Sequence, residues 1–287
     1  MKKVNLLAIL AISFILISFV ACTADQTVGS DASVTSTAVD EAQASNLNDQ
    51  VISAVDDYVN TSDANGFAKV NSAQKVNSIS ATDTVIVTID KTDLTVFPKK
   101  ISVDFGTTGY TDKRGNVLKG KIYITVSNRM TIAGSTRQIL FSNFYVNDNL
   151  VKGTKTVTYN GITDSKPSWS IVARDTITRV DGTTVIWNSD RTRTRIDDNS
   201  TPLIYWDDSY AISGSSNGIN AKGVAYTMTI DATKPLVTVG GWKYFVSGAV
   251  LITTEKRTAL LDYGDGTKDA KATITINGVT KDINLKK

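Results

Sequence analysis

Alternation of apolar and polar residues is the feature that most constrains this chain, and it begins at about Thr82. Apolar residues alternate with polar ones from Leu118 to Val126, from Val224 to Ile230 and from Ala272 to Ile276. Successive side chains of a strand point to opposite faces of a sheet, so each run predicts a strand with one buried face. A helical period is absent from these runs.

Turn signals separate the alternating runs. Asn-Gly and Asp-Gly pairs favour two-residue hairpin turns because both central residues need a positive φ angle, and they occur at Asn160-Gly161, Asp181-Gly182, Asn217-Gly218 and Asn277-Gly278. We therefore predict an all-β fold, an antiparallel sandwich of one or two sheet domains. Its N-terminal part would span residues 80–163 and its C-terminal part residues 164–287.

The N-terminus has the layout of an export signal. Lys2 and Lys3 precede an apolar run from Leu6 to Val20, and the small residue Ala21 follows. Charge, an apolar helix and then small residues are typical of a secretory signal peptide, which we assign to residues 1–21. The apolar run is also short for a helix that spans a bilayer, which needs about 20 residues.

Cys22 is the only cysteine of the chain. Phe19-Val20-Ala21-Cys22 resembles the lipobox of bacterial lipoproteins, in which the cysteine is acylated and becomes the new N-terminus. The resemblance implies lipid attachment at Cys22 with several acyl chains, palmitate among them, and two or more chains anchor a protein stably. We expect a protein held by lipid at the bacterial outer membrane or cell surface. A signal peptide that is cut elsewhere, or an uncleaved anchor, is the alternative.

Two further segments precede the β region. Residues 22–37 are rich in Ser, Thr, Ala and Asp without a hydrophobic period, which is typical of a flexible tether, here lipidated. Over residues 38–62 apolar residues recur at helical spacing, at Leu47, Val51, Val55 and Val59. We predict one amphipathic helix there, packed on the core by its apolar face rather than on a partner.

Two β segments resemble an uncharacterised family of secreted surface lipoproteins of Bacteroidetes. Asp104-Phe105-Gly106, Asp112-Lys113-Arg114-Gly115 and Gly120-Lys121-Ile122 match the family's DFG, D-x-x-G and G-K-I stretches. Asp262-Tyr263-Gly264-Asp265-Gly266 and the run from Ala272 to Gly278 are similar to its closing strands. The resemblance covers most of residues 80–287 and implies a β fold and export. It supplies no catalytic residue.

Composition excludes several kinds of chemistry. The chain has no histidine, so Ser-His-Asp and Cys-His catalysis and His-ligated zinc sites are impossible. The net charge of +3 is too small for the electrostatic footprint of a nucleic-acid-binding protein. The sequence holds no Walker loop, dinucleotide fingerprint or nucleophile elbow, and we predict no cofactor.

The carboxylates that remain are candidates for catalysis. They gather around Tyr205-Trp206, at Asp190, Asp197, Asp198, Asp207 and Asp208. A pair of carboxylates beside aromatic residues is what glycoside hydrolysis requires. Asp is also the usual residue of solvated turns, which we consider the better interpretation. The turn with Asp262, Asp265 and Asp269 lacks the spacing of calcium loops, so we predict no metal site.

Aromatic residues are candidates for ligand binding. Tyr205, Trp206 and Trp242 lie beside turn signals and are the aromatic residues that we expect to face a ligand, with a sugar as the fitting partner. Trp169 and Trp187 lie in alternating runs and are expected in the core.

Arg191, Arg193 and Arg195 share one face of an extended run. Such a row of guanidinium groups fits anionic ligands. The alternative, which we favour, is a solvated strand face that pairs with acidic neighbours such as Asp197.

Together these features favour a non-enzymatic, membrane-anchored lipoprotein that acts as a binding or structural β-module. Its expected partners are the membrane, through the lipid anchor, and a glycan or another envelope component, but not nucleic acid. One alternative is a carboxylate-dependent surface glycoside hydrolase. Another is a subunit of an envelope assembly that docks through an exposed strand edge.

Replacing Cys22 by Ala tests the lipid anchor. We expect the variant to incorporate no palmitate and to leave the membrane fraction, because the acyl acceptor is gone. Metabolic labelling and detergent phase partition measure both effects, with Thr23→Ala as the control. A Cys22→Ala protein that still partitions with the membrane would refute the lipobox interpretation.

Overall fold

The computed structural model describes residues 24–64, 85–90, 93, 95–197 and 206–285, with the side chains of the helix described from Asp31 to Asn60. The signal peptide, Cys22, Asp198 and Tyr205 lie outside the described residues. Within them, one helix and a single antiparallel sheet make up the fold. The prediction of an all-β fold with an N-terminal helix is confirmed.

The elements follow one another in a simple order. They are α1 (Ala24–Ala64), β1 (Ile86–Ile89), β2 (Lys99–Asp104), β3 (Tyr110–Thr111), β4 (Val117–Val126), β5 (Thr136–Val146), β6 (Asn149–Thr163), β7 (Lys166–Thr178), β8 (Thr184–Arg195), β9 (Tyr210–Ile219), β10 (Ala225–Ile230), β11 (Leu236–Thr238), β12 (Ser247–Thr254), β13 (Thr258–Asp265), β14 (Lys271–Ile276) and β15 (Val279–Asn284).

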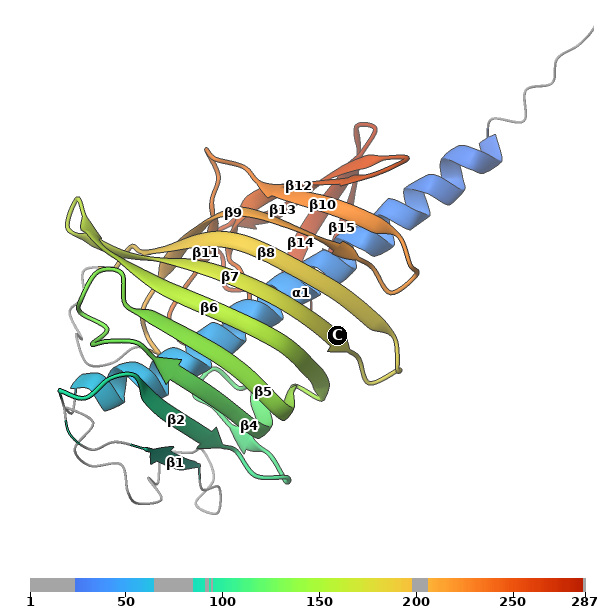
Figure 1. Ribbon diagram of the computed structural model, residues 1–287. Coiled ribbons are helices and arrows are strands. Elements are labelled where there is room, and N and C mark those ends of the chain that lie inside the picture. The colour runs from blue at the N-terminus through green and yellow to red at the C-terminus, as the bar shows by residue number, and fades with distance from the viewer. Residues whose placement is uncertain (1–23, 65–84, 91–92, 94, 198–205, 286–287) are drawn as a thin grey trace, which may run out of the picture.

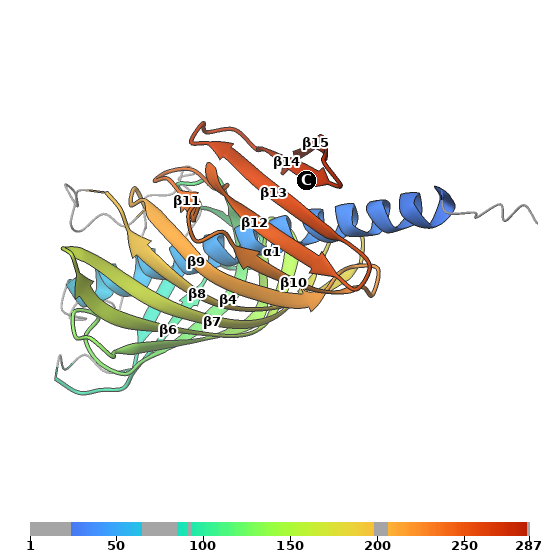
Figure 2. The same ribbon diagram turned by 90° about the horizontal axis from the view of Figure 1, so that it is seen from above.

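The sheet is a meander that curls around the helix. Strands pair with their neighbours in sequence nearly throughout, while β3 pairs with β4, and β11 pairs with β9 and β12. The arm with β6 to β8 and the arm with β13 to β15 lie on opposite sides of α1 (Figures 1 and 2). The expected N- and C-terminal β parts belong to this one sheet, because β6 and β7 pair from Leu150 and Thr178 to Thr163 and Lys166.

Of the four turns predicted at Asn-Gly and Asp-Gly pairs, two are present in the structure and two are not. Asn277 and Gly278 both have positive φ angles and join β14 to β15, and Asp181-Gly182 joins β7 to β8. The other two predicted turns are wrong. Asn160-Gly161 lies in β6 at a shift of register. Gly218 lies inside β9, where an added Cβ would be 2.1 Å from the Ile186 carbonyl oxygen, so close strand approach explains this glycine.

Helix α1 is longer than predicted and is not simply amphipathic. It begins at Ala24, so residues 24–37, expected as a tether, are helical, and Val34 and Thr37 are fully buried. The N-terminal turns project beyond the sheet (Figure 1). Tertiary burial stabilises the part of this segment from Val34 onward in spite of its weak hydrophobic period. From Val34 onward the sheet covers both the polar and the apolar side of the helix. It can do so because the concave face of the sheet presents cationic as well as apolar side chains.

Glu41 shows how the polar side of the helix is buried. Its carboxylate accepts hydrogen bonds from the Trp187 indole N–H and the Tyr226 hydroxyl, both at 2.8 Å, and from Arg191 at 3.2 Å. The side chains of Glu41 and Arg191 are 1% and 2% exposed. Losing solvation costs each charge several kcal/mol, so the burial is tolerated only because every oxygen is bonded.

Asp56, further along the helix than Glu41, is a second buried carboxylate that arginines bind. Its two oxygens pair with Arg137 from β5 and, at 2.8 Å, with Arg193 from β8. Between these two sites Lys155 from β6 donates to Asn48 of the helix at 2.7 Å and pairs with Asp175 of β7. The helix is therefore fixed at several points along its length by charged or charge-assisted hydrogen bonds.

Replacing Glu41 by Gln should destabilise the fold by about 3 kcal/mol, because Arg191 would remain buried without its counter-charge. Chemical denaturation measures the loss. Asp190→Asn is the matched control, since it breaks the exposed pair with Arg174 at 3.2 Å and should cost less than about 1 kcal/mol. Equal losses in the two variants would contradict the role given to Glu41.

Candidate ligand pocket on helix α1

The arginine row of β8 faces the protein's own acids. Arg191 binds Glu41, and Arg193 binds Asp56 with Asp49 at 3.8 Å. Arg191 and Arg193 are buried. The three arginines alternate along the strand as expected, but their face is the concave one and α1 covers it. The first two are therefore neither a solvated strand face nor open to an external anion, since the acidic helix already supplies their anions.

Arg195, at the end of the row, holds a second group of carboxylates. It lies 3.5 Å from Asp197 and 3.6 Å from Asp208, and Asp208 also accepts a hydrogen bond from the Tyr210 hydroxyl at 2.8 Å. Burial raises the pKa of Asp208 to about 6. This is the arrangement closest to the pair that hydrolysis would need. Its side chains bond to one another, and that of Asp208 is only 3% exposed.

The predicted aromatic residues come together in two adjoining turns. The Gly241 N–H donates to the Trp206 carbonyl at 3.0 Å, and the rings of Trp242 and Tyr244 meet edge to face at 5.9 Å. All three rings are half-buried. We call Trp206, Trp242 and Tyr244 the aromatic cluster. Trp187 is fully buried, as expected, and Trp169 is half-buried against Tyr159 and Tyr210.

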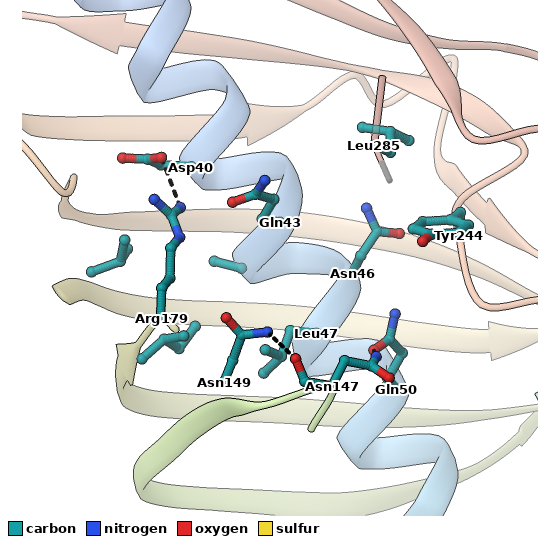
Figure 3. Close-up of a pocket in the computed structure, with 13 residues that line it drawn as sticks. Asp40, Gln43, Asn46, Leu47, Gln50, Asn147, Asn149, Arg179, Tyr244 and Leu285 are labelled. Carbon is teal, nitrogen blue, oxygen red and sulfur yellow. Dashed lines mark hydrogen bonds and ion pairs between the residues drawn. The ribbon is translucent and has the colours of Figure 1, made fainter. Parts of the chain in front are cut away.

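Beside this cluster a pocket lies along α1 (Figure 3). Its volume is about 70 Å³ and it is partly open to solvent, which leaves room for a few water molecules or one small group of a ligand. The helix supplies six of its residues, and strand ends and loops supply the rest: Asp40, Gln43, Ala44, Asn46, Leu47 and Gln50, with Asn147, Asn149, Ile177, Arg179, Val185, Tyr244 and Leu285.

Helix amides fix the loops that surround the pocket. Asn46 accepts a hydrogen bond from the Phe245 N–H at 3.0 Å, and Gln50 donates to the Lys243 carbonyl at 3.0 Å. Gln50 also accepts one from Asn147, at the β5–β6 turn, at 3.3 Å. The pocket is thus preformed by contacts within the protein, which lowers the ordering cost of binding.

Other polar groups at the pocket are available to a ligand. The Gln43 amide and the Asn149 side-chain oxygen have no hydrogen-bond partner among the described residues, and Gln43 lies at the centre of the view in Figure 3. Burial raises the pKa of the Tyr244 phenol, so its hydroxyl is a neutral donor. Leu47, Ile177 and Val185 provide an apolar floor.

The pocket contains one carboxylate among its described lining residues, and that group is engaged. Asp40 pairs with Arg179 at 2.7 Å and accepts the Ala221 N–H at 2.8 Å. No metal site is found among the described residues, which include no group of three acidic side chains that could hold a metal ion.

In the Asp262–Asp269 turn, carboxylates accept hydrogen bonds from the N–H groups of Gly264, Thr267 and Lys271. This is the turn role that the sequence favours.

Comparisons with known proteins gave no match to a family model, to a curated protein or to a solved structure. Of the helical residues that the structure describes, none form a segment both long and apolar enough to traverse a bilayer.

The sequence prediction missed Gln43, Asn149 and Arg179, because lone amides and one arginine carry no motif. The uncommon polarity of the helix was the signal that could have pointed to Gln43.

Proposed function

We propose that this protein is a lipid-anchored module of the bacterial envelope that binds a glycan without cleaving it, at the pocket on α1. The export signal, the lipobox-like Cys22 and the resemblance to surface lipoproteins support the location. The pocket beside the aromatic cluster supports binding, and it is the observation that carries the proposal.

The chemistry of the pocket matches that of a sugar. A sugar ring has an apolar face and a rim of hydroxyl groups, so its sites combine a flat ring with a few fixed polar groups. Here Tyr244 supplies the ring. Gln43 supplies a donor-acceptor amide and Asn149 an acceptor oxygen, both without a hydrogen-bond partner among the residues that the structure describes. The Arg179 guanidinium, held by Asp40, adds fixed donors at the rim.

The carboxylates support binding over hydrolysis. Glycoside hydrolysis generally needs two carboxyl groups on either side of the scissile bond. Asp40 is the single carboxylate of the described lining, and both of its oxygens accept hydrogen bonds from the protein. Asp197 and Asp208 do not line the pocket.

Gln43→Ala tests the site in a glycan-binding screen of the full chain in detergent. We expect affinity for the glycan that the screen identifies to fall about fivefold to tenfold, the loss of one or two hydrogen bonds, with an unchanged melting temperature. Gln138→Ala is the matched control, because Gln138 is exposed on the outer face of β5. Equal binding by both variants and the parent protein would refute the pocket, and the absence of any glycan ligand would refute the function.

A further inference from the structure

Three lysines surround the aromatic cluster. The Lys113 ammonium lies over the Trp206 ring at 5.0 Å, the Lys243 ammonium lies 5.6 Å from the Tyr244 ring, and Lys268 donates to the Gly240 carbonyl at 3.2 Å. Among the described residues, no carboxylate forms an ion pair with any of the three. They leave positive charge beside the half-buried aromatic rings.

Three carboxylates nearby are bound to other groups of the protein. Asp57 of α1 pairs with Arg114 at 2.8 Å, as Asp40 does with Arg179. Asp112 accepts the N–H groups of Arg114 and Asn116 in its own turn, at 2.9 and 2.7 Å. These three carboxylates therefore already have partners within the protein, whereas none of the three lysines has a carboxylate partner among the described residues, so an external anion can pair with them.

Hydrogen bonds connect the turns that carry the lysines to the pocket. Asn147 of the pocket donates to Asn116 at 3.2 Å, and Asn116 closes the turn that carries Lys113. Gln50 joins Asn147 to the Lys243 backbone, and Trp206 adjoins Gly241. Asp40 lines the pocket and Asp57 binds Arg114 beside Lys113, and α1 rises about 25 Å between these two residues. We call this set of groups the basic strip, made up of Lys113, Lys243, Lys268, the aromatic cluster and the pocket.

We infer that the ligand is an anionic polysaccharide, whose sugars carry carboxylate or sulfate groups and which lies along the basic strip. The hydroxyl-bearing edge of one sugar enters the pocket, neighbouring sugars lie against Trp242 and Trp206, and the acidic groups meet the lysines. The length of the basic strip favours a polymer over a single sugar, and its lysines favour an acidic polymer over a neutral one. This inference rests on the proposed function and names the ligand class.

The test is a calorimetric titration of the full chain in detergent with three probes: oligomers of a polyuronate, of dextran sulfate and of neutral dextran. We expect at least one acidic probe to bind, and to bind more weakly at about 300 mM than at about 50 mM NaCl because salt screens exposed charges. The acidic probe that binds better identifies carboxylate or sulfate as the recognised group.

The variant Lys113→Gln/Lys243→Gln/Lys268→Gln should weaken that binding about tenfold, because three charges that attract the acidic groups are lost. Lys152→Gln/Lys166→Gln/Lys281→Gln removes the same charge from exposed positions elsewhere and should bind like the parent protein. Trp242→Ala should weaken binding by a similar factor through the lost ring contact.

The outcomes separate the two proposals. Binding of neutral dextran that depends on Gln43 but not on the three lysines would overturn the anionic ligand and leave the glycan-binding function standing. Equal losses in the two triple variants would show non-specific attraction and would also overturn the inference. If no probe binds and the glycan screen is empty as well, both proposals fail.

Discussion

The buried ion pairs between α1 and the concave face of the sheet determine the rest of this structure. A helix with Glu41, Asn48 and Asp56 on its surface cannot be enclosed by apolar residues alone, because each desolvated charge costs several kcal/mol. The strands meet it with Arg137, Lys155, Arg191 and Arg193, all buried. Apolar contacts such as those of Val51 and Val55 drive the burial, and the ion pairs fix the position and rotation of the helix.

The pocket depends on this placement. Asn46 and Gln50 hold the loop with Phe245 and Lys243, and they can do so only while the helix keeps its rotation in the sheet. The same placement brings Asp57 to Arg114, next to Lys113 in its turn. The ion pairs of the interior thus set the positions of groups on the surface, among them the aromatic residue Tyr244.

The strands followed from the sequence, but the helix environment and the site did not. Alternation placed β4, β10 and β14 because it depends only on neighbours in sequence. It could not tell which polar groups face the core: Arg191 looked solvated, and its partner Glu41 lies 150 positions away. The Asn217-Gly218 pair predicts a turn, because a turn and a close strand contact both require glycine.

The candidate site was predicted in part. The turn signals around Trp206 and Trp242 predict both residues at a ligand site, and the structure brings those turns together. No sequence pattern predicts Gln43 and Asn149, since an amide becomes a ligand group only when the fold leaves it unpaired. That property depends on the partners of every neighbouring side chain, which no local pattern contains.

Native-state hydrogen exchange most directly tests whether α1 is a structural part of the core. We predict that amides from Val34 to Val59 exchange through the same opening as those of β7 and β8, with opening free energies equal within about 1 kcal/mol. Exchange of the helix several kcal/mol more easily than the strands would mean that α1 leaves the sheet on its own, which would contradict the role given to the buried ion pairs.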